Sequence, residues 1–183
     1  MNSYIDLKLL PDTEFRATIL MNAVYTKLHK ALHELSSTGI GVSFPQYRVT
    51  LGDVLRLHGT SESLEKLQHK SWLGGMAGYC SVSEVLPVPV NSQHRVVSRV
   101  QTNMSQSKLN RLIKRRKISA DAVKGYKAKM FSQRLENAYV ELKSSSNRHN
   151  HRRYIQFGNL VDEPVEGGFD YFGLSKIATV PWF

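Results

Sequence analysis

The sequence predicts an α+β protein built of two unequal parts, and three observations support this prediction. Segments with strand-like alternation and segments with helical period follow one another from the first residues onward. At 183 residues the chain can bury one substantial core, or two small cores that share an interface. Its formal charge of +10 lies entirely in the second part, because residues 1–94 hold eight basic and eight acidic residues, against seventeen and seven in residues 95–183. We therefore expect a domain boundary near residue 94.

The first elements of the chain are a strand and a long helix. Residues 4–9 alternate between apolar and polar side chains, as a half-buried strand does. Asp12 or Thr13 is the expected N-cap of a helix that runs from Glu14 to about Leu35 and has one apolar face.

The rest of the first half completes a mixed sheet pattern. The elements expected there are strands at 40–44, 54–58 and 78–88 and a short helix at 61–69. The resulting order, strand, helix, strand, strand, helix, strand, is that of the ferredoxin-like fold. We therefore predict an N-terminal ferredoxin-like (RRM-like) βαββαβ domain over residues 1–94. RNA-recognition modules place base-stacking aromatic residues on their central strands, and these residues are missing here, so the order of elements alone does not indicate a function.

A basic helix is the main feature of the smaller α+β domain predicted over residues 95–183. Residues 108–117 contain no acidic residue, and Leu109, Leu112 and Ile113 are spaced to contact a core. The basic residues of this segment are Lys108, Arg111, Lys114, Arg115, Arg116 and Lys117. Because no acidic partners compensate them, these cations favour phosphate contacts in a nucleic-acid duplex over a merely solvated helix face. A membrane-surface helix is disfavoured, since the apolar stripe is narrow and has no aromatic residue.

A polar loop is expected between two further strands, at 139–142 and 154–157. It runs from Lys143 to Arg153 and is rich in serine, histidine and arginine. Such a loop is either a flexible hairpin tip or a place where hydroxyls and cations converge on a phosphodiester. The apolar C-terminal residues, which include Trp182 and Phe183, are expected to dock against the fold.

Composition and spacing exclude several kinds of site. Cys80 is the single cysteine, so neither an intrachain disulfide nor a cysteine-based zinc site can form. No apolar segment approaches the ~20 residues that span a bilayer, and the first residues lack a signal-peptide pattern. His29 and His33 have a spacing that could bind a metal, but no obvious third ligand accompanies them, and the basic half lacks the paired carboxylates of a two-metal nuclease. We expect a soluble cytoplasmic protein that uses no metal or other cofactor.

Histidine is the side chain best suited to moving protons near neutral pH, and His29 is the candidate here. A metal-free ribonuclease needs one imidazole to transfer a proton while the 2′-OH of the RNA attacks the adjacent phosphate. Hydroxyls and cations then stabilise the developing charge, and the serines at 144–146 could supply the hydroxyls. The sequence leaves two other functional classes open. A non-catalytic binder of structured RNA would need neither His29 nor the serines, and a DNA-binding regulator would ordinarily need a dimer-forming element, which is not visible.

Several short segments, spread over both halves and near both ends of the chain, have the order and spacing of a known family. They are KLHKAL (27–32), IGVSFP (40–45), SRVQ (98–101), the basic helix, LKSSS (142–146), GGF (167–169), GLSK (173–176) and VPWF (180–183). Through these segments the chain resembles, along its whole length, the CRISPR RNA-processing endoribonuclease of type I-F systems.

The resemblance implies an activity and a set of partners. Precursor CRISPR RNA would be cut just 3′ of the repeat stem-loop without a metal ion, leaving a 2′,3′-cyclic phosphate. His29 and Ser144 match the catalytic histidine and serine of the family, and Ser146 matches a second loop serine that helps to hold the active site. The implied partners are the CRISPR repeat RNA, which stays bound after cleavage, and the other subunits of the interference complex in a prokaryotic cytoplasm.

The resemblance also implies how the RNA is held. The Arg-rich helix enters the major groove of the hairpin, and Arg99 and Gln101 match linker positions that read base pairs low in the stem. The RNA-binding residues expected in this way are Arg99, Gln101, Lys108, Arg111, Lys114, Arg115, Arg116, Lys117, His151, Arg152 and Phe172. The chain departs from the family at four positions. Phe172 stands in place of a tyrosine, with Tyr171 before it, His151 in place of a stacking aromatic residue, and Leu112 and Asn110 in place of basic residues.

Overall fold

The computed structural model describes residues 1–101, 104–132, 135–143 and 150–183 of the chain. The elements of the first half are β1 (Ser3–Leu9), α1 (Ala17–Glu34), β2 (Gly41–Ser43), β3 (Val54–Gly59), α2 (Ser61–His69), the 3₁₀ helix η1 (Gly74–Tyr79), β4 (Cys80–Val82) and β5 (Leu86–Pro87). Those of the second half are β6 (Gln93–Val100), α3 (Gln106–Lys114), α4 (Ala120–Ser132), β7 (Tyr139–Lys143), β8 (Asn150–Phe157) and β9 (Thr179–Trp182). The protein is thus α+β, as predicted, with antiparallel sheets.

Two antiparallel sheets organise the described residues. The first has the order β2-β3-β1-β4, with β5 pairing the start of β1, and the second has the order β7-β8-β6-β9. Strand β6 belongs to two ladders, because its residues 93–96 pair with β9 and its residues 97–100 pair with β8. The predicted boundary near residue 94 lies in this strand.

The alternation and helical period of the first half predict most of its elements correctly, with two corrections. Asp12 does not cap α1: its carboxylate accepts from the N–H groups of Glu14 and Phe15 in a turn, and the helix begins only at Ala17. The fourth strand is divided into β4 and β5, because the Ser83 hydroxyl accepts from the Asp6 N–H, where a regular ladder would use a backbone carbonyl. Residues 78 and 79, expected in that strand, end η1 instead.

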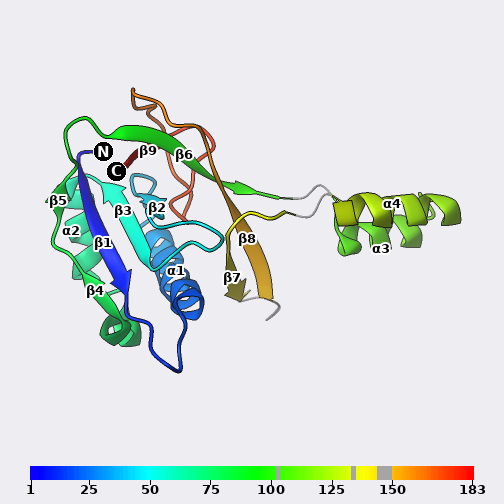
Figure 1. Ribbon diagram of the computed structural model, residues 1–183, viewed down its shortest axis with the longest axis horizontal. Helices are drawn as coiled ribbons and strands as arrows, with labels where there is room; N and C mark the ends of the chain where they lie inside the picture. The colour runs from blue at the N-terminus through cyan, green and yellow to red at the C-terminus, as the bar shows by residue number, and fades with distance from the viewer. Residues whose placement is uncertain (102–103, 133–134, 144–149) are drawn as a thin grey trace.

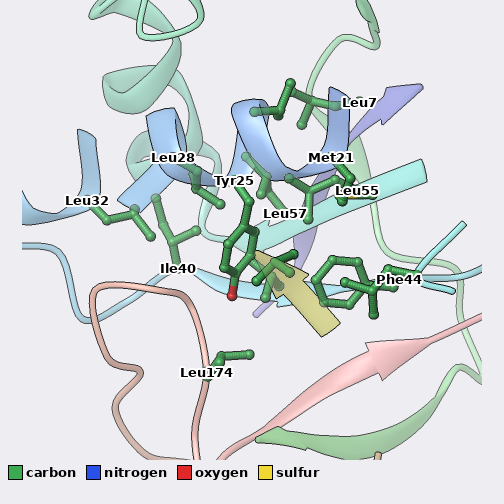
Figure 2. Close-up of a cluster of buried hydrophobic side chains, with 14 of the residues drawn as sticks. Leu7, Met21, Tyr25, Leu28, Leu32, Ile40, Phe44, Leu55, Leu57 and Leu174 are labelled. Atoms are coloured by element: carbon green, nitrogen blue, oxygen red, sulfur yellow. The ribbon is translucent and has the colours of Figure 1, made fainter. Parts of the chain in front are cut away.

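The core forms where α1 lies across the first sheet. One face of α1 buries Met21, Tyr25, Leu28 and Leu32 against apolar residues that Figure 2 shows on β2, β3 and the loops beside them. Apolar side chains of the second half join the same cluster. Leu174 from the C-terminal segment approaches the Tyr25 ring from the side opposite the helix (Figure 2). The C-terminal segment therefore closes the core of the first half.

The last strand packs directly on the first sheet. A Cβ added to Gly41 would lie 2.6 Å from Val180 Cγ1, so only a residue without a side chain fits in β2 at this point. At the end of the chain, the Arg56 guanidinium donates to the carbonyl of Phe183 at 2.8 Å and lies 4.0 Å from its ring centroid. The expectation of a docked C-terminus is confirmed.

Two expectations for the second half are corrected. The basic helix α3 ends at Lys114, so Arg115 is its C-cap and Arg116 and Lys117 lie beyond it. Leu109 is fully buried, whereas Ile113 is 47% exposed and does not dock on a core. Figure 1 shows α3 and α4 side by side and apart from the two sheets.

The predicted polar loop is shorter than expected. Strand β8 begins at Asn150, so that His151, Arg152 and Arg153 lie on a strand opposite residues of β7. Cross-strand pairing favours this extension, since Arg152 forms an ion pair with its partner Glu141, at 3.6 Å. No helix among the described residues is long and apolar enough to cross a membrane.

Candidate active site

His29 lies on α1 and contacts a turn that comes 140 residues later in the chain. Its imidazole stacks on the Phe172 ring, with centroids 3.7 Å apart and planes inclined by 8°. Its Nδ1 is 2.9 Å from the carbonyl oxygen of Tyr171. The His33 ring, one turn later on the same helix, packs edge-to-face with the Tyr171 ring, with centroids 5.2 Å apart. The turn thus contacts His29 in two ways: the Phe172 ring stacks on the imidazole, and the Tyr171 carbonyl oxygen lies within hydrogen-bond distance of its Nδ1.

The contact with Tyr171 determines the tautomer of His29. A carbonyl oxygen can only accept, so Nδ1 must carry the proton and donate it. When the ring is neutral, Nε2 then has a free lone pair and can accept a proton. Burial lowers the pKa of His29, and the positive charges of Arg153 and His33 add to this effect, while the bond to Tyr171 and the charge of Asp170 oppose it. His29 is therefore neutral near neutral pH, as a general base must be.

The turn that carries Tyr171 and Phe172 is built by Asp170 and Gly173. One carboxylate oxygen of Asp170 accepts from the backbone N–H groups of Phe172 and Leu174, both at 2.9 Å. Gly173 adopts a φ of +70°, and its carbonyl accepts from the Val42 N–H of β2. The turn is thereby fixed internally and tied to the first sheet.

Two further side chains hold the Phe172 position. The buried Tyr25 hydroxyl donates to the Phe172 carbonyl at 2.7 Å, and burial raises the pKa of Tyr25, so that its hydroxyl keeps the proton it donates. The guanidinium carbon of Arg153 lies 3.5 Å from the Phe172 ring centroid. Both backbone and ring of Phe172 are therefore constrained.

Arg99 and Gln101 lie beside this cluster, at the end of β6. The Gln101 amide is oriented with its oxygen toward Arg99, because that oxygen can accept from the guanidinium whereas the amide nitrogen would meet only donors. Both residues line an open hollow of about 710 Å³ together with Arg153, Asp170 and Lys176. Three cations against one carboxylate make this hollow attractive to an anionic or acceptor-rich ligand.

The predicted basic surface on α3 is exposed and lies apart from His29. Lys108, Arg111 and Lys114 are on the helix, and all three are exposed. Ser105 caps the helix by accepting from the Lys108 N–H. The exposed cations that follow the helix are Arg115, Arg116 and Lys117.

Two of the predicted catalytic residues follow β7 in the sequence, and two of the predicted RNA contacts lie on β8. Ser144 and Ser146 lie outside the described residues. His151 and Arg152 are exposed on β8, and the Arg152 guanidinium lies 4.4 Å from the Tyr139 ring centroid. β7 itself packs on α1, since the Glu141 N–H donates to the Asn22 side chain at 2.8 Å. Strand β7 and the helix that carries His29 are thus in direct contact.

Sequence reasoning missed four contributors to the His29 environment. They are Tyr25, Arg153, Asp170 and the Tyr171 carbonyl. Residues 143–153 are predicted to form a loop, so the sequence gives no side-chain direction for Arg153. On a strand, alternation places Arg153 and Arg152 on opposite faces. The segment Asp170-Tyr171-Phe172-Gly173 carries a usable signal, since an aspartate three residues before a glycine is typical of a side-chain-capped turn.

The described residues contain no group of three or more side chains of the kinds that hold a metal ion. His29 and His33 have ring centroids 6.4 Å apart, inclined by 67°. Their surroundings are the turn described above, and the Nδ1 of His29 is already used by the Tyr171 carbonyl. The chemistry available here is proton transfer by an imidazole next to a cationic surface.

Known proteins are similar to this chain over its whole length. Residues 4–183 match the model of a family described as CRISPR-associated protein (Cas_Csy4). The whole chain aligns with the whole of a CRISPR-associated endonuclease Cas6/Csy4 from Escherichia coli (strain UTI89 / UPEC), with 39% identity over 184 positions. A protein of the same name from Pseudomonas aeruginosa (strain UCBPP-PA14) is 36% identical over 187 positions, again over the full length of both chains.

Proposed function

The chain belongs to the CRISPR-associated Csy4 protein family, and from this premise we propose that it is a metal-independent endoribonuclease that cuts precursor CRISPR RNA just 3′ of the repeat stem-loop. The observation that carries the proposal is the tautomer and the neutral charge of the His29 imidazole. Its Nδ1 donates to the Tyr171 carbonyl, which leaves Nε2 of the neutral ring free to accept a proton. The full-length similarity to proteins named endonucleases supports an enzyme over a passive RNA binder.

In the proposed reaction the RNA supplies its own nucleophile. Nε2 of His29 accepts the proton of the 2′-OH as O2′ bonds to the adjacent phosphorus. The bond from phosphorus to the 5′-oxygen of the next nucleotide breaks, that oxygen takes up a proton from water, and His29 then releases its proton to the solvent. The products are a 2′,3′-cyclic phosphate on the hairpin and a 5′-hydroxyl on the released strand. Ser144 holds the nucleophile in this scheme, and Ser146 supports the loop.

The proposed RNA contacts divide into base-reading and phosphate-binding groups. Arg99 and Gln101 read base edges low in the stem, and they line the hollow next to Arg153. Their mutual hydrogen bond supports this role, because it aligns two side chains that prefer guanine and adenine. The exposed cations of α3 and its C-terminal extension bind phosphates in the major groove. His151, Arg152 and Phe172 complete the proposed RNA-facing set.

The architecture supports the same assignment. The element order of the first half and the sheet order β2-β3-β1-β4 support the ferredoxin-like domain that we propose for residues 1–94. Residues 95–183 form the RNA-binding part in this proposal, and the net positive charge lies there. The cleaved hairpin stays bound to this part, in the interference complex of the prokaryotic cytoplasm.

A cleavage assay in EDTA tests the proposal. With RNA of the organism's own CRISPR repeat, we expect cleavage at one defined phosphodiester and a cyclic phosphate end. His29→Ala should slow single-turnover cleavage by at least about 100-fold, because general base catalysis is lost, while RNA binding is kept. His69→Ala, which changes an exposed histidine on α2, should cleave like the wild type.

Two results would contradict this proposal. Cleavage at the wild-type rate by His29→Ala would remove His29 from the mechanism. Cleavage of a repeat with 2′-deoxyribose at the cut site would show that the 2′-OH is not the nucleophile. Binding of the repeat with no cut at all would favour the non-catalytic RNA binder.

A further inference from the structure

The Phe172 ring has charged or polar groups stacked on both of its faces. The His29 imidazole covers one face at 3.7 Å and is nearly parallel to it. The Arg153 guanidinium carbon lies 3.5 Å from the same ring centroid. An atom this close cannot lie beside the ring edge, because van der Waals contact there begins farther from the centroid. Since His29 occupies one face, Arg153 occupies the other, and the three groups form one stack.

Arg153 is held in this place by its surroundings. Its residue is 6% exposed, and its Nη1 lies 4.0 Å from an oxygen of Asp170. Its Nε is buried and has no hydrogen-bond partner among the described residues. A buried guanidinium with an open donor costs free energy of folding, and this cost points to a role for its position. The nearby charge of Arg99 adds to this cost, since burial and Arg99 both lower the pKa of Arg153.

We propose that Arg153 is a positioning residue for His29: its flat guanidinium presses the Phe172 ring against the imidazole, and its positive charge disfavours a second positive charge on that imidazole. The proposal extends the proposed function, because it assigns to Arg153 a part, beside burial, in holding His29 in the state that can accept a proton. Arg153 acts here through Phe172 and through its field, without contact to the reacting atoms.

The charges around His29 come from three elements. His33 on α1 and Arg153 on β8 disfavour a second positive charge on the imidazole. Asp170 in the turn favours it, and so does the hydrogen bond to the Tyr171 carbonyl. Asp170 also accepts two backbone N–H bonds, which spread part of its negative charge. Removing Arg153 would leave the negative charge of Asp170 without an opposing charge on β8. The protonated form of the His29 imidazole would then become more stable.

Two substitutions separate the charge of Arg153 from its shape. Arg153→Gln keeps a flat polar end group and removes the charge, and Arg153→Lys keeps the charge and removes the flat group. Arg152→Gln is the matched control, because Arg152 is the neighbouring residue of β8 but is exposed and lies over Tyr139. The first readout is the titration of His29 by NMR in the free protein, without RNA.

The expected results differ for each variant. In Arg153→Gln the pKa of His29 should rise, and the acidic limb of the single-turnover pH profile at saturating RNA should move to higher pH. In Arg153→Lys the pKa of His29 should stay near that of the wild type, while the rate at the plateau should fall about tenfold because the ring is held less firmly. Arg152→Gln should leave the pKa of His29 unchanged.

An unchanged or lowered pKa of His29 in folded Arg153→Gln would overturn the role of the charge. An unchanged plateau of the cleavage rate in Arg153→Lys would overturn the role of the stack. Should Arg153→Gln fail to fold, the wild type still tests the stack, because the Phe172 ring must shift the resonances of both Arg153 and His29 upfield, and Phe172→Leu must abolish both shifts. Absence of either shift would refute the stack. The titration needs no RNA, so a failure of the proposed cleavage activity cannot be mistaken for a failure of this inference.

Discussion

At residue 173 the backbone turns through a conformation that glycine adopts without strain. The φ of Gly173 is +70°, and an added Cβ would lie 2.5 Å from Val42 Cγ1. Its carbonyl binds the Val42 N–H, so the turn cannot move away from the first sheet without breaking that bond. The residues just before it present a carbonyl and a ring to His29. The geometry of the His29 imidazole therefore depends on a residue that does not contact it.

Gly173→Ala should affect stability and cleavage together. The strained φ and the clash with Val42 should cost about 1–3 kcal/mol of unfolding free energy, and the displaced turn should slow cleavage by loosening His29. Urea unfolding and single-turnover cleavage measure the two effects. Gly75→Ala is the control, because no atom lies within 4 Å of its added Cβ and its φ is not positive. Wild-type behaviour of Gly173→Ala would show that the turn adapts freely.

On the scale of single elements, the end of α3 explains how its cations are divided. The Lys117 N–H bonds to the Leu112 carbonyl and the Arg116 N–H to the Ile113 carbonyl, which is the pattern of a Schellman motif. Arg116 takes the left-handed position at φ +51°, where glycine is usual. The helix therefore stops at Lys114, and the last basic residues leave its axis. The basic residues of this segment are thus divided into a group on the helix and a second group in the turn that follows it.

Replacing one cation of this surface should change how RNA binding depends on salt. Arg115→Ala should weaken binding of the repeat hairpin, and it should reduce the slope of log affinity against log salt by about one, because one fewer phosphate is neutralised. Lys66→Ala on α2 removes the same charge from the balanced half and should leave the slope unchanged. Binding titrations at several salt concentrations distinguish the two. A wild-type slope in Arg115→Ala would remove Arg115 from the phosphate contacts.

At the scale of the whole molecule, both halves share one apolar cluster, and polar groups are buried where they meet. His58 on β3 is fully buried and bonds to the Ser43 hydroxyl at 2.8 Å. Burial lowers the pKa of His58 to about 3, helped by the charges of Arg56, the N-terminal amine and His94. The neighbouring Arg56 is itself bound to Asp6 and to the C-terminal carbonyl. The two ends of the chain thus meet next to a histidine that stays neutral.

Stability should fall as the pH is lowered through the acidic range. The unfolded chain takes up a proton at His58 below about pH 6.5, while the folded protein does not do so until about pH 3. The unfolded state therefore binds more protons in this window, and His58 alone should cost the fold on the order of a few kcal/mol across it. Denaturant unfolding of the wild type and of His58→Gln between pH 8 and pH 4 checks this, with the difference at pH 8 as the baseline. Parallel pH dependence in both proteins would contradict the assignment.

Much of the fold follows from the sequence because it depends on local patterns. Alternation predicts β1 and helical period predicts α1, since burial on one face needs only the right spacing. The first-turn residues Ser61, Glu62 and Glu65 indicate α2, and β3, predicted at 54–58, is buried at every position. The uneven charge and the basic segment that includes α3 are also readable directly from composition. The division of the fourth strand and the extension of β8 were not readable, because they depend on Ser83 meeting Asp6 and on Arg152 meeting Glu141 across strands.

The sequence by itself determined most elements of the first half, the charge distribution, His29 as the candidate proton-transfer residue and the resemblance to a family. Only the tertiary structure decided what surrounds that histidine. The Tyr171 carbonyl, the Phe172 ring and the Arg153 guanidinium come from segments more than 120 residues away from His29, and no local period links them. Their meeting requires α1, β8 and the turn before Gly173 to pack together. The tautomer and charge of an imidazole are set by what lies against it, and that is a property of packing.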